Sequence, residues 1–413
     1  MSSALPSPSL EPRARRRHTA LIAVAAVAAA TLLACNDNTT QPKQRPLDPA
    51  LVAQGKTVFR LDTYGDETFW TDTLRMHEVI AAAVSPATAL SVGLKVDLDT
   101  LPQAVRDAIV AGQVDLNSPA TTVALLKLGA VVGVIGEVDA SDHLTRVGVT
   151  CALCHSTVDD AFAPGIGHRL DGWPNRDLNV GAIIALSPAL TAAQKAVYNS
   201  WGPGRYDARF NQDGMNLPVV IPSAFGLRNV RREIYTGDDT ISYWNRYVAV
   251  TQMHGHGTFV DARIGVNVQN PPENVTTAKL AALREYQFSL EKPAPIPGSY
   301  DVAAAARGKV VFEGAGQCSS CHAGSVLTDV NSGRLHAASE VGQDAVYAAR
   351  SVTKMYRTTP LRGLFHPPQL QGPYFHDGNA ATLDAVVEHY VTTRNLTLTA
   401  QQKADLVQYL KTL

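Results

Sequence analysis

The sequence predicts a mainly α-helical protein made of two tandem domains, the first of them enlarged by an insertion. Three observations predict this arrangement. A helical segment with one pattern occurs twice, as Gly55–Phe59 and as Gly308–Phe312. Each copy is followed by one Cys-x-x-Cys-His string, at Cys151–His155 and at Cys318–His322. Between the copies lies the Pro-rich stretch Glu291–Pro297, which cannot continue the preceding helix and therefore predicts a linker.

The repeat sets the boundaries of the two domains, at residues 51–292 and 298–413. Each copy closes with apolar residues spaced i, i+3 and i+7, over residues 283–290 and 406–413, which indicates one face of a packed helix. Thr399, three residues before Gln402, predicts a capped start for the last helix.

The copies differ in the segment between the first helix and the cysteines. Cys318 follows Phe312 closely, whereas a long insertion over about residues 60–145 separates Phe59 from Cys151. It contains a helix-prone apolar stretch, Thr121–Val138, and an amphipathic one, Leu101–Val110. The insertion either shields one edge of a site or only adds hydrophobic core.

The two Cys-x-x-Cys-His strings are attachment signatures of a c-type haem. Two thiols three positions apart can form thioethers with both vinyl groups of one porphyrin, and the following histidine binds iron from the proximal side. The haem-bonded residues are then Cys151, Cys154, Cys318 and Cys321, and His155 and His322 are iron ligands. Zinc or disulfide is the weaker reading, because the two pairs lie far apart and the chain's fifth cysteine is Cys35. The sequence therefore predicts two covalently attached haems in two cytochrome c-like domains.

Residues 1–34 predict an export signal, because an arginine cluster precedes an Ala-rich apolar run too short for a transmembrane helix. The run ends in Leu-Leu-Ala-Cys35, which resembles the lipobox of bacterial lipoproteins, so Cys35 is the expected lipidation site; an ordinary secretory signal is the alternative. Residues 35–50 form a polar tether. These features predict a membrane-anchored lipoprotein in the bacterial periplasm or on the outer surface. The net charge of −1 gives no support to a nucleic-acid partner.

The sixth iron ligand decides what each haem can do, since a thioether raises the potential and an empty position admits small molecules. Met355 is the candidate for the His322 haem, because it lies in a Pro-containing loop between the haem motif and the last helix. Its alternative role is a core residue.

The C-terminal half resembles the corresponding domain of bacterial di-haem cytochrome c peroxidases and their MauG-like relatives. The motifs that carry the resemblance are Met355–Gly363, Gly372–Gly378 and the segment from Ala381. The resemblance implies that Met355 ligates a high-potential, electron-accepting haem, where MauG has tyrosine. It also implies that His376 is structural and near the haem, and that the protein is a homodimer.

The first half matches the same family less well. Gly165–His168, with Pro174–Arg176 after it, resembles the segment that carries the distal histidine of the low-potential haem. His168 is therefore a candidate sixth ligand of the His155 haem, or a histidine beside a haem propionate. Competing candidates for this position are Met215, Met253, His254 and His256.

Two family features have no clear counterpart in the first half. The acidic catalytic residue is missing, with Gln252 as the nearest polar candidate, and Tyr235–Asp239 replaces the usual turn. The bridging tryptophan also has no assigned position, although Trp244 or Trp173 could serve. These departures weaken a peroxidase assignment, because peroxide cleavage needs an open iron and a positioned acid–base group.

Calcium, which lies between the haem domains in the peroxidase relatives, is a further candidate ligand. Asp62, Asp66 and Glu67 form an acidic cluster, and Asp171, Asn175 and Asp177 could contribute. No EF-hand ligand series is present.

The expected function is that of an exported, lipid-anchored di-haem c-type cytochrome that transfers electrons. Its partner would be a small cytochrome, a cupredoxin or a quinol-linked complex. The alternative is a peroxidase-type oxidoreductase that reduces hydrogen peroxide at the His155 haem with electrons from the His322 and Met355 haem.

Overall fold

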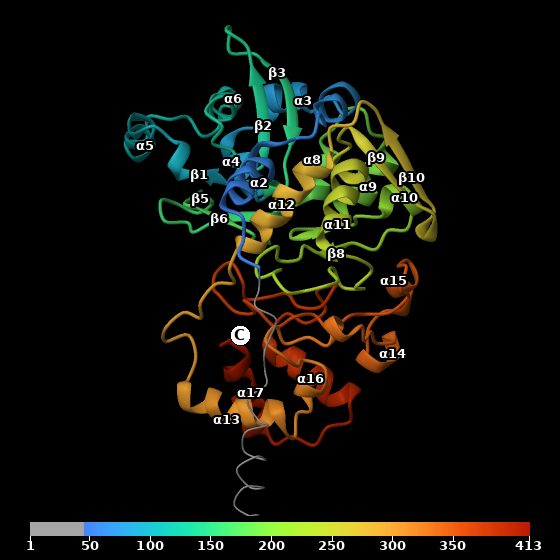
Figure 1. Ribbon diagram of the computed structural model, residues 1–413. Helices are drawn as coiled ribbons and strands as arrows, with labels where there is room; N and C mark the ends of the chain where they lie inside the picture. The colour runs from blue at the N-terminus through green and yellow to red at the C-terminus, as the bar shows by residue number, and fades with distance from the viewer. Residues whose placement is uncertain (1–44) are drawn as a thin grey trace, which may run out of the picture. The chain divides into compact units, whose positions relative to one another are not determined.

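The computed structural model describes residues 45–413, so the predicted signal peptide, Cys35 and most of the predicted tether lie outside the described residues (Figure 1). Helix α2 (Pro49–Leu61) begins within the last two residues of that tether, because Asp48 caps it by accepting hydrogen bonds from the amides of Ala50 and Leu51. Residues Leu47–Leu413 form one compact unit. Within the described residues, no helix is long and apolar enough to span a membrane.

Two matching helix pairs confirm the internal repeat. Helix α2 packs on α12 (Thr277–Ser289), and α13 (Val302–Glu313) packs on α17 (Ala400–Leu410). A Cβ on Gly55 would lie 2.0 Å from the Ala282 carbonyl oxygen, and one on Gly308 would lie 2.0 Å from that of Asp405. The repeated glycine is therefore required by the close approach of the two helices.

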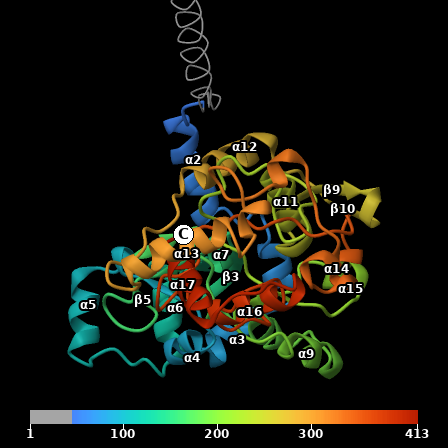
Figure 2. The same ribbon diagram turned by 90° about the horizontal axis from the view of Figure 1, so that it is seen from below.

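The same pairs carry matching aromatic contacts. The ring centroids of Phe59 and Tyr286 lie 5.5 Å apart, and those of Phe312 and Tyr409 lie 5.2 Å apart. The predicted cap of α17 is confirmed as a capping box between Thr399 and Gln402. Figure 2 looks onto α13, α17 and α16 (Leu383–Thr393), which cover the C-terminal half.

The insertion is a mixture of short helices and strands. The predicted amphipathic stretch is helix α5 (Gln103–Val110). The helix expected over Thr121–Val138 is only partly present, because α6 ends at Lys127 before Gly129, and Val134–Val138 forms strand β2. The other elements here are η1 (Thr68–Thr73), α3 (Met76–Ala83), α4 (Pro86–Ser91), β1 (Val96–Asp97), η2 (Leu98–Thr100), α6 (Pro119–Lys127) and β3 (Leu144–Val149).

Strand pairing fastens the insertion to the segment after the first haem motif. Strand β1 pairs in parallel with β5 (Ile166–Gly167), and β2 pairs with β3 in an antiparallel ribbon that leads to Cys151. A buried ion pair, Arg169 to Asp97 at 2.9 Å, joins the same two segments. The insertion is therefore part of the wall of the first haem motif.

Small elements complete the N-terminal half, and each sheet of the described residues has two strands. They are α7 (Ala152–His155), β4 (Ser156–Val158), β6 (Arg169–Asp171), α8 (Val180–Ala185), α9 (Ala192–Asn199), β7 (Arg205–Tyr206), α10 (Phe210–Asp213), β8 (Val219–Val220), α11 (Ile241–Tyr247), η3 (Val248–Gln252), β9 (Gly257–Asp261), η4 (Ala262–Ile264) and β10 (Val266–Asn270).

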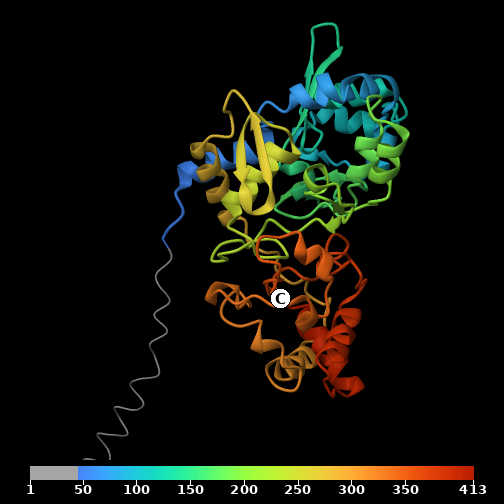
Figure 3. The same ribbon diagram turned by 90° about the vertical axis from the view of Figure 1, so that its right-hand side faces the viewer.

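The C-terminal half consists of helices and loops, with η5 (Cys318–Ser320), η6 (Val330–Ser332), α14 (Ala338–Val341) and α15 (Ala345–Ala349) as its short helices. Within Leu47–Leu413, Figures 1 and 3 show this half below the N-terminal half, with loops from both meeting between them. Buried ion pairs join the two halves, such as Arg350 to Asp207 at 3.1 Å. The mainly helical fold is confirmed, and the division into two domains stays a prediction.

Candidate haem sites

The first Cys-x-x-Cys-His string forms the one-turn helix α7 and leads into strand β4. The Nδ1 atom of His155 lies 3.1 Å from the carbonyl oxygen of Pro222. A carbonyl can only accept, so Nδ1 carries the proton and donates. The other ring nitrogen, Nε2, then has the lone pair that an iron ligand needs.

The second string makes the same arrangement with a local partner. The Nδ1 atom of His322 lies 3.1 Å from the carbonyl oxygen of Leu327, five residues further along the chain. Burial lowers the pKa of both His155 and His322 to about 4, which keeps both imidazoles neutral near pH 7. Both proximal histidines therefore have the tautomer and the charge required for ligation.

The four cysteines of the two strings are free thiols. Burial raises the pKa of Cys151 and Cys154 to about 12 and that of Cys318 to about 11. These three thiols are therefore neutral near pH 7. No disulfide forms among the described residues.

A cavity of about 300 Å³ opens over the second string. The side chains of Cys318, Cys321 and His322 line it together with residues from helices α16 and α17. The volume is at the lower end of ordinary cofactor sites, and the lining joins the two cysteines, the histidine and a largely apolar wall. These residues fit a covalently attached haem.

The cavity is also lined by residues that the sequence did not place near the second string. Arg176, Pro222 and Tyr235 reach it from the N-terminal half. Pro222 is also the acceptor of the His155 hydrogen bond. Only the fold reveals this link between the two motifs, because Pro222 lies 67 positions after His155.

Met355 lies in the expected loop but is half-buried and is not among the residues that line the cavity. Its neighbour Tyr356 does line the cavity, and the Tyr356 hydroxyl lies 3.3 Å from Nε2 of His376. His376 also faces the cavity, where its Nδ1 lies 3.1 Å from Gln343. These contacts agree with a structural His376 near the haem, and the role of Met355 as sixth ligand stays a prediction.

His168 is not brought together with His155. The antiparallel ribbon of β4 and β6 carries it away from the motif, because Asp159 pairs with His168 at the far end of the ribbon. Its side chain is 53% exposed, and Nδ1 lies 2.8 Å from the carboxylate of Asp99. In this placement His168 forms a surface hydrogen bond with Asp99 of the insertion.

The other four candidates for the sixth position lie in different surroundings. Met215 is exposed, and Met253 is buried in the core of the N-terminal half. His254 stacks on Phe69 with centroids 3.6 Å apart, and burial lowers its pKa to about 4. His256 lies 3.5 Å from Thr68. The loop of His254 and His256 runs along Tyr64, but its sixth-ligand role stays a prediction.

Trp173 occupies the boundary between the halves. It packs at the edges of Phe225 and of His366, with centroids 6.0 and 4.8 Å away, and shares a buried cluster with Leu370. Trp244 instead lies in the core of the N-terminal half beside Tyr247. Of the two candidates for a bridging tryptophan, only Trp173 contacts residues of both halves, and its bridging role stays a prediction.

Gln252 is buried in the N-terminal half. Its side-chain oxygen accepts a hydrogen bond from Tyr206 at 2.8 Å, and its nitrogen donates to Asn211 at 2.9 Å. Both ends of the amide are therefore occupied.

The acidic residues considered for calcium are held by protein groups. Asp62 pairs with Lys279 at 2.7 Å, and Glu67 accepts from Thr63 at 2.5 Å. Asp171 pairs with Arg60, and Asp177 pairs with Lys95. A calcium site stays a prediction.

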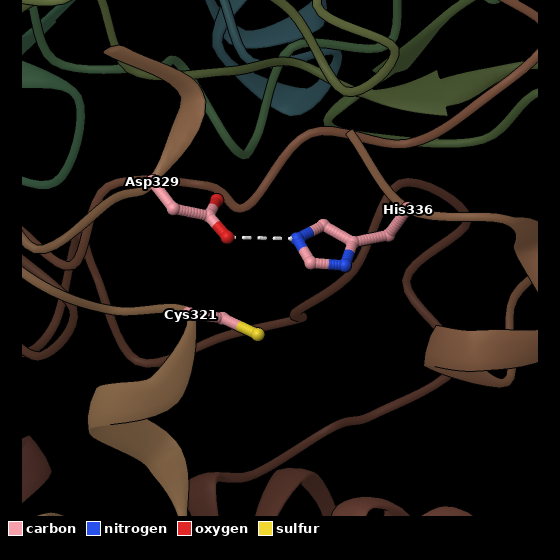
Figure 4. Close-up of side chains that lie close together, drawn as sticks. All are labelled: Cys321, Asp329 and His336. Carbon is pink, nitrogen blue, oxygen red and sulfur yellow. Dashed lines mark hydrogen bonds and ion pairs between the residues drawn. The ribbon is translucent and has the colours of Figure 1, made fainter. Parts of the chain in front are cut away.

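Among the described residues, Cys321, Asp329 and His336 form a group of possible metal ligands (Figure 4). His336 is buried, and its Nε2 lies 3.1 Å from Asp329 and 2.9 Å from the Thr358 hydroxyl. Cys321 belongs to the haem motif, so a thioether would occupy its sulfur. The group is therefore best explained as a hydrogen-bonded histidine that fixes the loop after the motif.

Comparison with known proteins finds no matching family model. Part of the chain is similar to MauG. The methylamine utilization protein MauG of Methylorubrum extorquens is 31% identical over 125 residues, which are 26% of this chain and 34% of that protein. The chain thus matches about a third of the length of this curated relative.

Two solved structures are similar to part of the chain. Hydrazine synthase of Kuenenia stuttgartiensis aligns at 19% identity with a TM-score of 0.34, over 49% of this chain and 74% of the other. A MauG-like protein associated with microbial copper homeostasis aligns with the same identity and TM-score, over 49% and 75%.

Proposed function

We propose that this chain is an exported, lipid-anchored di-haem c-type cytochrome that transfers electrons through two covalently bound haems. The observation that carries the proposal is the pair of Cys-x-x-Cys-His strings, each with a neutral imidazole fixed through Nδ1 to a backbone carbonyl. A solitary string could be a chance sequence, but two strings whose histidines each donate Nδ1–H to a backbone carbonyl both fit haem attachment.

In this proposal the cysteines of each string hold a haem by thioethers, and His155 and His322 bind iron from the proximal side. The haem irons supply one-electron redox chemistry when bound. Met355 is the proposed sixth ligand at the C-terminal site. The carbonyls of Pro222 and Leu327 orient the two imidazoles and raise their basicity by accepting the Nδ1 proton.

The placement of Pro222 supports exchange of electrons between the two sites. It accepts from His155 and lines the cavity above His322, so one residue contacts both sites. Trp173 offers a second contact across the same boundary.

We further propose that Cys35 is lipidated and that the chain acts as a homodimer in the periplasm or on the outer surface. The redox partner would be a small cytochrome, a cupredoxin or a quinol-linked complex. Replacement of Cys35 by serine should move the protein from the membrane fraction to the soluble fraction after cell fractionation. Equal membrane retention of both proteins would contradict the lipid anchor.

Reaction with hydrogen peroxide separates a carrier from a peroxidase. The protein is reduced by one electron per chain, peroxide is added, and absorption spectra and peroxide consumption are recorded. A carrier should keep six-coordinate, low-spin spectra and show no turnover. Sustained peroxide consumption that depends on a reduced cytochrome would contradict the carrier function and favour the peroxidase alternative.

A further inference from the structure

The wall of the cavity above His322 carries more buried positive charge than negative charge. Three arginines line it: Arg176 from the N-terminal half, and Arg357 and Arg362 from the loop after Met355. One buried carboxylate, that of Glu233, forms ion pairs with two of them, because its Oε2 lies 3.1 Å from Arg357 and 3.8 Å from Arg362.

Arg176 has no carboxylate partner among the described residues. Its Nη1 atom is shielded from solvent and makes no hydrogen bond there, and the titratable groups that act on its guanidinium are the hydroxyls of Tyr235 and Tyr374. The Nε atom of Arg357 is likewise buried without a partner. A buried, unpaired guanidinium N–H costs free energy unless a ligand accepts from it.

The remaining charged groups on the wall neutralise one another. Glu340 lies 3.8 Å from Arg394 and 3.0 Å from His336, and it also pairs with Arg334 at 3.3 Å, outside the cavity. The three arginines and Glu233 therefore leave an excess of two positive charges facing the cavity. A ligand with two carboxylates would balance it.

We propose that Arg176 binds a propionate of the haem attached at Cys318 and Cys321, so that a residue of the N-terminal half clamps the haem of the C-terminal half. Arginine suits this task because its planar N–H groups match a carboxylate and stay charged even when buried. The excess of two charges corresponds to the two propionates of one haem. This inference rests on the proposed haem at His322.

The clamp also joins the two halves around the cofactor. Arg176 lies three residues after Trp173, and the intervening Asn175 donates its amide to the Cys154 carbonyl at 2.9 Å. The segment that carries Arg176 is therefore anchored on the first haem motif. Arg176 acts as a positioning residue, because this short segment holds it over the cavity.

The test replaces Arg176 by glutamine in the full-length protein and measures both haem midpoint potentials by spectroscopic redox titration. Loss of the guanidinium leaves a propionate charge that favours the oxidised iron. The midpoint potential of one haem should therefore fall by about 59 mV. At a fixed potential this lowers the ratio of reduced to oxidised haem about tenfold, because one electron is transferred. Arg176→Lys, which keeps the charge, should preserve most of the potential.

Arg205→Gln is the matched control. Arg205 also crosses between the halves, donating to the Asp377 carbonyl at 3.1 Å, but it does not line the cavity. The Arg205→Gln substitution should leave both midpoint potentials unchanged. The clamp would be overturned if both midpoint potentials were unchanged in Arg176→Gln, or if Arg205→Gln shifted a midpoint potential by the same amount.

The wild-type protein gives an independent measurement that holds if Arg176→Gln fails to fold. An ion-paired propionate stays ionised, so one wave should have a constant midpoint from about pH 6 to about pH 8. A midpoint that falls with pH in both waves would contradict the clamp. The number of covalent haems per chain distinguishes a wrong clamp from a wrong proposed function. If only the clamp is wrong, the chain still carries two haems. If the proposed function is wrong, the assay for covalent haem is negative.

Discussion

Gly308→Ala tests the helix pair that supports the second haem site. An alanine Cβ at this position would lie 2.0 Å from the Asp405 carbonyl oxygen and 2.9 Å from Cβ of Tyr409, whereas an ordinary contact is at least 3.4 Å. Helices α13 and α17 would have to separate by about 1.4 Å, the difference between 3.4 and 2.0 Å. Overpacking of this kind costs about 1–3 kcal/mol. Alanine recovers about 1 kcal/mol through its helix propensity.

The free energy of unfolding should therefore fall by up to about 2 kcal/mol. Urea unfolding followed by far-ultraviolet circular dichroism measures it. Ala306→Gly is the control, since this residue is exposed on the same helix and reports the propensity contribution alone. A Gly308→Ala protein that is more stable than the wild type would refute the packing argument.

Gly55→Ala extends the test to the repeat. Its Cβ would lie 2.0 Å from the Ala282 carbonyl oxygen, so the expected loss is similar. If the halves are separate domains, Gly55→Ala and Gly308→Ala should lower different unfolding transitions. A single transition that both substitutions lower together would contradict the two-domain prediction.

Two further predictions concern the sites. Met355→Ala should remove the sulfur-to-iron absorption band and lower one of the two potentials, because a thioether favours reduced iron; two unchanged potentials would show that Met355 is not a ligand. Asp66 is buried, and this burial, together with Glu67 and Asp62, raises its pKa well above the usual value despite the hydrogen bond from Val149. The folded state then binds more protons than the unfolded state, so stability should decrease as pH rises above about 4. Chemical unfolding at several pH values should show a smaller decrease for Asp66→Asn, and an equal decrease would contradict this assignment.

The sequence predicted the features that depend on local pattern. The helix pairs follow from the repeated Gly-x-x-x-Phe segment, and the cap at Thr399 follows from its spacing to Gln402. The ligand roles of His155 and His322 are inferred from the spacing of each motif and stay predictions, whereas their hydrogen bonds to Pro222 and Leu327 are seen only in the fold.

The rest depends on contacts between distant segments. Val134–Val138 forms a strand because it pairs with Leu144–Val149, although the stretch before it is helical. His168 faces Asp99 because the insertion folds back onto the ribbon after the motif. Arg176 and Pro222 reach the cavity above His322 only because the two halves pack against each other. No periodicity or spacing in the sequence carries that information.

The central claim is that both motifs carry a covalent haem. Intact-mass spectrometry of the purified, denatured protein tests it most directly, together with a pyridine haemochrome assay. We expect the mass of the chain plus two haems, with Cys151→Ala/Cys154→Ala and Cys318→Ala/Cys321→Ala each losing one. A wild-type mass that corresponds to one haem or to none would contradict the claim.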